Sequence, residues 1–505
     1  MVMPTATGTI ATQDAYEPRH AEDALLYRVI AAELETFLAS ARDRGHALPA
    51  FVENTFREFL TCGVPAHGFV RVHCDRCGDD RVVAFSCKRR GVCGSCGGRR
   101  MAQTAANLVD RVLPDAPMRQ WVLSLPFSLR YRLAYDRTLV APLLGAFVRA
   151  VFASLRRRAR QSYGLRRTKC GAVTFIQRFG GAINLNVHFH SLVIDGVYTV
   201  PPHGPQVQFF ELPAPSTEEV ARVLADSAAG IAAALERAGL GTDDDCDSAD
   251  PLARDDPELA ALYAAAVQGR VATGPRIGQR TTQLGDPEFA SDSPLQVSAK
   301  CATLSGLSLH ADTSAATNDR AGLERLCRYM ARPALATERL HRADDGRIVY
   351  RLRHRRRDGT SHLVFEPQEL LARLAALIPP PRAHQTRYHG ILAPCAGWRD
   401  HVVPGTKKTE PPGKPETPGV VVGDPPPCSH EPRRVPPASR IAWAELLRRV
   451  FAADALRCRR CGSRMRIMAA IRSPQSIRAF LKCVGLPARP PPLAPPRREP
   501  AAEFA

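Results

Sequence analysis

The chain has 505 residues, which favours two to four domains and is long enough to bury a sizeable core. Lys and Arg number 69 against 50 Asp and Glu, and the formal charge of +19 favours a polyanionic partner, of which nucleic acid is the commonest. The N-terminal sequence MVMPTATGTIATQDAYEP lacks the basic and apolar regions of a signal peptide, and Arg149 interrupts the apolar run LLGAFVRAVFASL. We therefore expect a cytoplasmic, nucleoid-associated protein without a membrane partner.

Residues 1–50 are predicted to form a helical segment, because 21–45 repeat apolar residues at helical spacing and end at Gly45. Residues 51–105 are rich in cysteine. They contain two C-x₂-C pairs separated by fifteen residues, a spacing typical of a zinc ribbon. Four thiolates leave no open position on Zn²⁺, so we predict a structural zinc with the ligands Cys74, Cys77, Cys93 and Cys96. Cys87 is left over, and it would replace a ligand or join a second site with Cys62 or His73.

Residues 106–403 are predicted to form an α+β domain. Its expected elements are a strand that enters a helix at Pro126 (120–136), a hairpin about Gly180-Gly181 (171–196), a helix ended by Pro333 (318–333) and two strands joined at Asp358-Gly359 (346–367). Residues 236–300 are polar and irregular and look like an insertion. Two basic clusters, 154–169 and 351–359, favour a surface that tracks phosphates, although each could also be a solvated helix face or strand edge.

The C-terminal part of the chain has a different composition. Residues 404–440 are rich in proline and are predicted to be a linker, and 487–505 are predicted to be a disordered tail. Between them, 441–486 form a small module with a single C-x₂-C pair, Cys458 and Cys461. This pair predicts zinc more weakly than the first two do, because Cys483 is the only thiol nearby.

The run NLNVHFHSLVIDGVY (184–198) has the β-branched and apolar composition of a strand. Alternate residues of a strand share a face, so His188 and His190 lie together on one side and Phe189 lies on the other. Two imidazoles on one rigid strand can begin a metal site, but two structural histidines would show the same pattern.

A second chemical feature is the helix LERLCRYMARP. Its apolar residues at helical spacing face a core, and Tyr329 lies to one side of them. Arg325 and Arg332 neighbour Tyr329 on the helix surface, and Arg328 precedes it. A phenol can attack phosphorus if a metal polarises the phosphate and cations hold it. Taken alone, this pattern favours a tyrosine at the edge of a core. Together with the histidine pair and the basic clusters, it also fits a nucleophile whose phosphate is held by the three arginines.

These features resemble a known family. The segments FSCKRRGVCGSCGGRR, NVHFHSLVIDGVY, LERLCRYMARPALATERL, DGTSHLVFEP and RYHGILAP are similar, in the same order, to transposases of rolling-circle insertion sequences. More narrowly, they resemble the insertion sequence ninety-one family and its common-region relatives, in which the C-terminal CRRCG module also recurs. The resemblance spans residues 20–400.

The resemblance implies an HUH endonuclease, a class named for a His-hydrophobic-His motif that matches His188, Phe189 and His190. The implied fold is α+β, with an N-terminal zinc-ribbon-like module, a central antiparallel-sheet HUH nuclease domain with flanking helices, and a small C-terminal CxxC module after the linker. The histidines would hold Mg²⁺ or Mn²⁺ on a DNA phosphate. Tyr329 would attack that phosphate to form a 5′-phosphotyrosine link, so the partners would be single-stranded element ends and target DNA.

Two points of this site stay open. Some relatives carry a second tyrosine four residues before the first, but Arg325 stands there in this chain. The third ligand of the metal is also undefined. Gln177 ranks first, because a two-residue turn at Gly180-Gly181 would place it opposite Asn184 on the histidine face, and His310 and Asp195 are alternatives.

Three other functions fit some of the same residues. A zinc-dependent hydrolase can use a strand-borne histidine pair, but it needs further ligands from several strands. A non-catalytic zinc-ribbon protein would bind DNA with structural histidines and tyrosine. A plasmid relaxase or replication initiator shares the chemistry, but the cysteine cluster and RYHGILAP disfavour it. The oligomeric state is not defined by the sequence.

Overall fold

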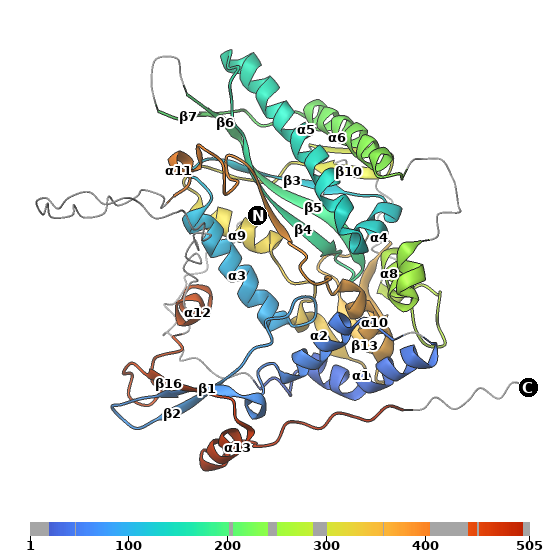
Figure 1. Ribbon diagram of the computed structural model, residues 1–505, viewed down its shortest axis with the longest axis vertical. Helices are drawn as coiled ribbons and strands as arrows, with labels where there is room; N and C mark the ends of the chain where they lie inside the picture. Colours follow the sequence, from blue (N-terminus) through green and yellow to red (C-terminus); the bar gives the residue numbers. More distant parts are fainter. Residues whose placement is uncertain are drawn as a thin grey trace, which may run out of the picture.

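The computed structural model describes residues 20–45, 47–200, 206–240, 250–285, 300–356, 358–404, 443–451 and 454–497. The fold is mixed α+β, as predicted, with a large central sheet, helices on both of its faces and a separate cysteine-rich module (Figure 1). The predicted linker, 404–440, lies almost entirely outside the described residues.

The central sheet has seven strands, all in antiparallel pairs, in the order β15-β4-β5-β3-β10-β9, with β11 also paired to β3. The strands are β3 (Met118–Ser124), β4 (Gly171–Phe179), β5 (Leu185–Ile194), β9 (Cys301–Leu304), β10 (Leu307–His310), β11 (Ser314–Ala315) and β15 (Thr386–Gly390). β4 and β5 form the predicted hairpin at the centre of this sheet. Nearly every residue of both strands is buried, which explains their almost continuous apolar and β-branched sequences.

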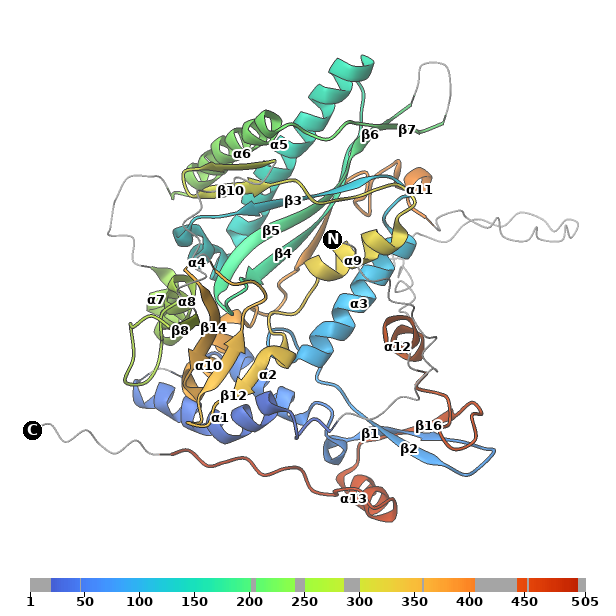
Figure 2. The same cartoon turned by 180° about the vertical axis from the view of Figure 1, so that it is seen from behind.

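Helices cover both faces of the central sheet (Figures 1 and 2). One face packs against α4 (Phe127–Tyr135), α5 (Arg137–Tyr163), α6 (Thr217–Arg237) and α8 (Pro257–Gln268), and the other packs against α3 (Gly94–Arg111) and α9 (Arg320–Met330). Alternate residues of β5 therefore enter two different cores: Phe189 joins the first, and Leu192 joins the second.

The helix α5 contains the apolar run noted in the sequence. Asp136 caps its first turn by accepting a hydrogen bond from the Thr138 amide at 3.0 Å, and Gly164 ends it in a left-handed conformation. Among the described residues it alone is long and apolar enough to cross a membrane, with a mean hydropathy of 1.8. However, 67% of that apolar stretch is buried inside the fold, so its composition is explained by core packing.

A second sheet lies beyond the end of the first and has the strand order β12-β13-β14-β8. Its strands are β8 (Thr282–Gly285), β12 (Leu340–Arg342), β13 (Ile348–Arg351) and β14 (Thr360–Phe365), and nearby helices are α1 (Leu25–Asp43), α2 (Ala50–Thr61) and α10 (Pro367–Leu377). The remaining short elements are η1 (Pro65–His67), β6 (Gly196–Thr199), β7 (Gln208–Glu211), α7 (Pro251–Asp255), η3 (Thr337–Arg339) and α11 (Arg399–Val402).

The cysteine-rich module is built from both ends of the chain. Strands β1 (Phe69–His73) and β2 (Asp80–Ala84) form a hairpin, and β16 (Arg466–Ile471) pairs with β1 from outside. The helices α12 (Trp443–Phe451) and α13 (Pro474–Cys483) flank β16 in sequence. We call residues 443–497 the C-terminal strap, because they run across the N-terminal part of the fold rather than forming an independent module.

Two predictions about irregular segments were wrong where the structure describes them. Residues 251–285 of the expected polar insertion contain α7, α8 and β8, and α8 buries Tyr263 completely because its inner side is apolar. The expected disordered tail is extended but bound up to residue 497: Ala494 donates its amide to the Ala31 carbonyl at 3.1 Å. Residues 241–249, 286–299 and 498–505 of these two segments lie outside the described part.

The burial of Phe189 predicts its contribution to stability. Its side chain is fully buried, so Phe189→Ala should lower the free energy of unfolding by about 3–5 kcal/mol through lost transfer energy and a residual cavity. Phe127 is 61% exposed, and Phe127→Ala should change it by less than about 1 kcal/mol. Urea unfolding of the three proteins measures both values, and equal effects would contradict the assignment of Phe189 to the core.

Candidate functional site

His188 and His190 lie on β5, on the face that α9 covers. Their Nε2 atoms are 2.9 Å apart, and both side chains are buried. Phe189 points to the other face of the sheet, where it belongs to the opposite core. The period of the strand thus brings the two imidazoles together and makes Phe189 the residue that anchors the strand, as the sequence pattern predicts.

The outer nitrogens of the two imidazoles have hydrogen-bonding partners. His188 Nδ1 lies 2.8 Å from the Asn186 carbonyl, which can only accept, so this nitrogen carries the proton. His190 Nδ1 lies 2.5 Å from the side-chain amide of Gln120, whose oxygen and nitrogen exchange places on a simple flip. As placed, Gln120 Nε2 donates to His190 Nδ1, and His190 Nε2–H donates to His188 Nε2. With the Gln120 amide flipped, both Nε2 atoms would bear lone pairs, and a cation between them would stabilise that arrangement.

Both imidazoles are held in their neutral form. Burial lowers the pKa of His188 to about 4, and it lowers the pKa of His190 well below its ordinary value, with the charge of Arg332 acting in the same direction on both. Neutral imidazole is the form that binds metal ions. Adjacent ligands about an octahedral Mg²⁺, each at about 2.1 Å, lie about 3 Å apart, so the observed separation of the Nε2 atoms fits such an ion.

Gln177 is directly opposite His188 on β4, and not opposite Asn184 as a two-residue turn would require. The expected register was wrong because the loop is longer, with Gly180 N–H bonded to the Asn184 carbonyl, and because the pairing is irregular after Gln177. Gln177 Nε2 donates to the Met330 carbonyl at 2.7 Å. Its Oε1 is buried and has no hydrogen-bond partner within the described residues, so the chain offers an oxygen ligand beside the histidines.

The other two candidates for the third ligand lie elsewhere. His310 pairs with Val122 on β3, and Val122 pairs with His190, so two strand spacings of about 4.8 Å separate the histidines. Asp195 follows β5 and forms a buried ion pair with Arg119 at 2.7 Å. Neither side chain forms a metal-ligating group with His188 and His190 among the described residues.

Tyr329 lies next to the histidine pair. Its ring is 6.0 Å from that of His190, measured between centroids, in an edge-to-face orientation of 84°, and its side chain is 37% exposed. Asp319 caps the helix that carries it by accepting the Gly322 amide at 2.7 Å. The same helix buries the apolar residues that recur at helical spacing, which are Leu323, Leu326, Cys327 and Met330. A solvent-accessible phenol therefore stands above a buried imidazole pair.

The three predicted arginines have different environments. The Arg332 guanidinium is 4.8 Å from the Tyr329 ring centroid, and its buried Nε has no hydrogen-bond partner in the described part of the chain. Arg328 donates through Nη2 to Glu324 at 2.6 Å, its buried Nε also has no hydrogen-bond partner among the described residues, and Arg325 is exposed. Arg353, from the basic cluster at 351–359, lies 5.6 Å from the same Tyr329 ring. The cations that meet the tyrosine are thus Arg332 and Arg353, and burial lowers the pKa of Arg332.

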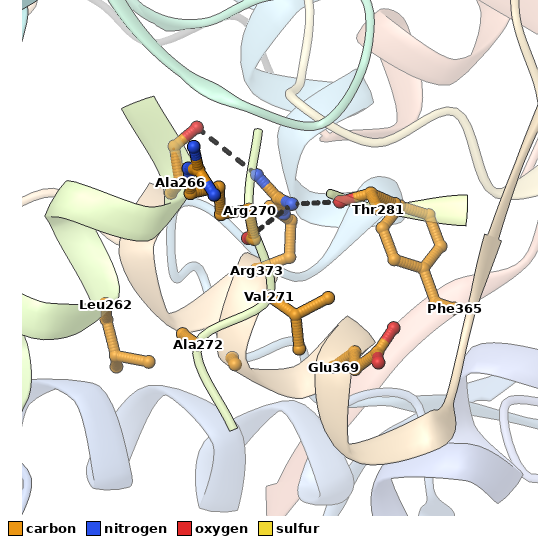
Figure 3. Close-up of a pocket in the computed structure, with 10 residues that line it drawn as sticks. Leu262, Ala266, Arg270, Val271, Ala272, Thr281, Phe365, Glu369 and Arg373 are labelled. Carbon is orange, nitrogen blue, oxygen red and sulfur yellow. Dashed lines mark hydrogen bonds between the residues drawn. The ribbon is translucent and has the colours of Figure 1, made fainter. Parts of the chain in front are cut away.

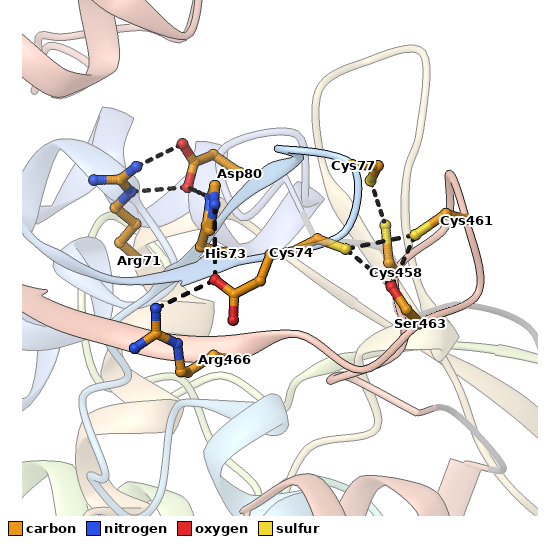
Figure 4. A network of polar contacts seen from close by, with 10 residues as sticks. Arg71, His73, Cys74, Cys77, Asp80, Cys458, Cys461, Ser463 and Arg466 are labelled. Atoms are coloured by element: carbon orange, nitrogen blue, oxygen red, sulfur yellow. Dashed lines mark hydrogen bonds and ion pairs between the residues drawn. The ribbon is translucent and has the colours of Figure 1, made fainter.

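The cysteines form two clusters of four, and these differ from the predicted set. The first cluster contains Cys62, Cys87, Cys93 and Cys96, and the second contains Cys74, Cys77, Cys458 and Cys461 (Figure 4). The single site predicted from Cys74, Cys77, Cys93 and Cys96 was therefore wrong in its grouping, because β1 and β2 direct the first pair toward the strap and away from α3. Cys87 lies with Cys62 in the first cluster, which fits the sequence-based alternative that these two cysteines share a site. His73 belongs to neither cluster, and its Nδ1 lies 3.0 Å from the Asp80 carboxylate.

The sulfur geometry of both clusters fits a tetrahedral ion. Sγ–Sγ distances of 3.6 and 3.7 Å in the first cluster and 3.5 Å in the second approach the separation of about 3.8 Å expected when four thiolates bind Zn²⁺ at about 2.3 Å. In the second cluster, the Ser463 hydroxyl lies 3.1 Å from Cys74 Sγ and lowers the pKa of this thiol to about 6. The donor set is that of a structural zinc site.

Cys458 and Cys461 thus have the partner pair that the sequence did not reveal. Cys483, the nearby thiol, is exposed and belongs to neither cluster. Gln120 was also missed, although a glutamine inside the buried apolar strand MRQWVLS is a signal that a polar partner is near. No local signal in the sequence assigns Arg353 to Tyr329, because that contact depends on how two sheets meet.

A hollow beneath α10 does not serve as a ligand site. It is occupied by the buried Arg373, which donates to the carbonyls of Ala266 and Arg270 and to the Thr281 hydroxyl at 3.2, 2.9 and 2.5 Å (Figure 3). Burial lowers the pKa of Arg373 to about 10, which leaves it charged at neutral pH. Because the Arg373 guanidinium donates to these protein groups, its hydrogen bonds connect α10 with α8 and with the 269–281 segment.

We expect the first turn of α3 to depend on a metal ion bound by the first cysteine cluster. Cys93 caps that helix and Cys96 lies in its first turn, so Cys87→Ser should remove about one Zn²⁺ per chain and raise hydrogen exchange in 94–97. Cys395 is exposed and outside both clusters, and Cys395→Ser should change neither quantity. Metal analysis with exchange mass spectrometry measures both, and an unchanged zinc content in Cys87→Ser would contradict the site.

Two family models match separate parts of the chain. Residues 31–125 match the family model described as "Transposase zinc-binding domain", and residues 171–399 match the one described as "Putative transposase". No curated protein and no solved structure matches the chain. The first match contains all N-terminal cysteines of the two clusters, and the second contains the histidine pair and Tyr329. The two matches support a transposase with a zinc-binding domain, and they are consistent with the insertion sequence ninety-one family.

Proposed function

We propose that this transposase is an HUH-type tyrosine enzyme of a rolling-circle insertion sequence, which nicks and joins single-stranded DNA through a 5′-phosphotyrosine intermediate. The observation that carries the proposal is the meeting of His188, His190 and Tyr329 on one side of the central sheet. The phenol of Tyr329 is accessible above a pair of buried, neutral imidazoles whose Nε2 atoms converge.

His188, His190 and the unpaired oxygen of Gln177 would hold a divalent ion, Mg²⁺ or Mn²⁺. When bound, the ion would polarise a DNA phosphate and stabilise the charge that develops on it. The Nδ1 contacts to the Asn186 carbonyl and the Gln120 amide fix the orientation of the two rings. Gln177 also donates to the Met330 carbonyl, the last of α9. The same side chain would therefore bind the ion and hold the tyrosine helix beside it.

Tyr329 would supply the nucleophile. Its phenolic oxygen would form a bond to phosphorus while the bond from phosphorus to the 3′ oxygen breaks. The phenol proton leaves to solvent, the departing oxygen takes a proton, and the products are a 5′-phosphotyrosine and a free 3′-OH. In the joining step a 3′-OH of the target would attack the phosphotyrosine and release Tyr329.

Arg332 and Arg353 would hold the phosphate during this exchange. Both guanidinium groups lie against the Tyr329 ring, and Arg332 has a buried donor without a partner among the described residues. A buried, incompletely paired cation is costly unless an anion completes it, so this position favours a phosphate. Arg325, one turn before Tyr329 on α9, and Arg328, the residue before it, would contact the strand farther from the reacting bond.

Only one tyrosine on α9 would act in this scheme, because Arg325 occupies the position of the second tyrosine in some relatives. A 3′-OH or a second protomer would resolve the intermediate. Of the alternatives, a zinc hydrolase is disfavoured because the strand neighbours of His190 are the apolar Val122 and Phe175, which provide no further ligands. If the protein does not nick DNA, a non-catalytic DNA-binding function would replace this proposal.

Removing the phenol hydroxyl tests the nucleophile. Incubation with Mg²⁺ and single-stranded oligonucleotides from the ends of the encoding element should give a protein–DNA adduct with the wild type and none with Tyr329→Phe, because a phenyl ring cannot attack phosphorus. Tyr163→Phe alters another exposed tyrosine, on α5, and should leave the adduct unchanged. Denaturing gels with DNA labelled on the 5′ or 3′ side of the nick measure both the adduct and its polarity.

Two substitutions of Gln177 separate a metal ligand from a structural residue. Gln177→Leu and Gln177→Glu both lose the donor to the Met330 carbonyl, but only the glutamate keeps an oxygen beside the histidines. Gln177→Leu should weaken Mn²⁺ binding by about 10–100-fold, while Gln177→Glu should retain it. Titration of Mn²⁺ followed by electron paramagnetic resonance measures the affinity, and equal losses in the two variants would remove Gln177 from the ligand set.

A further inference from the structure

The second cysteine cluster joins distant parts of the chain. Cys77 and Cys458 are 381 residues apart in sequence, yet their sulfurs lie within 3.5 Å, and the same distance separates Cys74 from Cys461 (Figure 4). The zinc-binding domain matched by residues 31–125 contains only the first half of this site. The second half belongs to the C-terminal strap, to which no matched family assigns a role.

The four sulfurs are arranged for one ion and not for other cysteine chemistry. Distances of 3.5 Å are far longer than a disulfide bond of about 2.05 Å. All four ligand atoms lie within 4.8 Å of one another, as they would around a single tetrahedral Zn²⁺. Ser463 adds a hydroxyl beside Cys74 and Cys461, at 3.1 and 2.8 Å, where it can donate to a thiolate.

The strap has little apolar contact of its own to keep it in place. Five of the six residues of β16 are exposed although the strand pairs with β1 along its length. The buried cores that include strap residues are small: one contains Phe69, Val82, Ile477 and Leu481, and the other contains Val72, Cys74, Cys458 and Met465. Cores of this size rarely hold a segment without a metal or a disulfide, so the four thiolates are the feature that is suited to stabilise the strap.

The strap also reaches the helix that carries Tyr329. Arg449 on α12 forms ion pairs with Asp110 on α3 and with Glu324 on α9, the latter at 2.8 Å. Glu324 is in turn bonded to Arg328, one residue before Tyr329. At its other end, the strap bonds to α1 through Ala494 and Arg497. A fixed strap would therefore limit the motion of α9 relative to α3.

We propose that Cys74, Cys77, Cys458 and Cys461 bind one Zn²⁺ that fastens the C-terminal strap to the N-terminal module, and that the fastened strap braces the tyrosine helix through Arg449. The proposal concerns the metal content and the mobility of the chain, so it stands or falls independently of strand nicking. Arg449 acts as a positioning residue, since it contacts Glu324 and not the histidines or Tyr329.

Metal analysis of the full chain tests the first part. The wild type should contain about two Zn²⁺, and Cys458→Ser/Cys461→Ser should contain about one, with the first cluster intact. Cys458→His keeps a nitrogen ligand at this position and should retain the second ion. Cys483→Ser removes an exposed strap cysteine outside both clusters and should leave the zinc content unchanged. A double variant that still holds as much zinc as the wild type would overturn the site.

Hydrogen exchange in the same proteins tests the fastening and the brace. Loss of the second zinc should raise exchange at least tenfold in β1, where β16 detaches, and also in α9, while β5 in the central sheet remains protected as evidence of folding. Arg449→Ala should keep two zinc ions and the protection of β1, but raise exchange in α9. Arg448→Ala is the matched control, because Arg448 pairs with Glu445 of its own helix.

The outcomes are distinct for each part of the proposal. If the double variant loses zinc but β1 keeps its protection, zinc does not fasten the strap. If β1 loses protection and α9 does not, or if Arg449→Ala behaves as Arg448→Ala does, the brace is wrong. Changes in both segments with an unaltered β5 would support the full proposal.

Discussion

The antiparallel pairing of β5 with β4 and β3 is the constraint on which the rest of the site depends. Both neighbours bond to β5 over most of its length, so the direction of each of its side chains is fixed. A shift of one residue would turn Phe189 toward α9 and the imidazoles into the opposite core. The large apolar area buried by Phe189 and its neighbours therefore specifies the position of His188 and His190, even though those neighbours contact no ligand.

The electrostatics of the site follow from the burial that this pairing imposes. Removing the imidazoles from water disfavours their charged form and leaves two neutral nitrogens that converge. Arg332 is also largely removed from water, and its Nε finds no partner in the described structure. The buried oxygen of Gln177 and the Nε of Arg332 have no hydrogen-bond partner among the described residues, which is unfavourable by itself. A metal ion together with a phosphate would satisfy both at once.

The cysteine clusters connect segments that are far apart in the sequence. Two short knuckles from opposite ends complete one site, and β16 adds to the β1–β2 hairpin to give a three-stranded sheet. The entropic cost of such a long closure grows only logarithmically with the number of residues, so a single four-thiolate site can offset it. The first cluster ties the end of α2 to the start of α3, which packs directly on α9. Both clusters thus act on the surroundings of the same helix.

The sequence by itself determined what depends on neighbours along the chain. The period of two placed His188 and His190 on one face, the helical period gave the buried side of α9, and the C-x₂-C spacing gave the zinc knuckles. Tertiary structure alone decided which knuckle meets which, because any two pairs satisfy the same local rule and only β16 pairing with β1 selects among them. It also set Gln177 opposite His188, through a loop longer than a two-residue turn, and brought Arg353 to Tyr329. These relations join residues that are distant in sequence, and packing rather than local preference determines them.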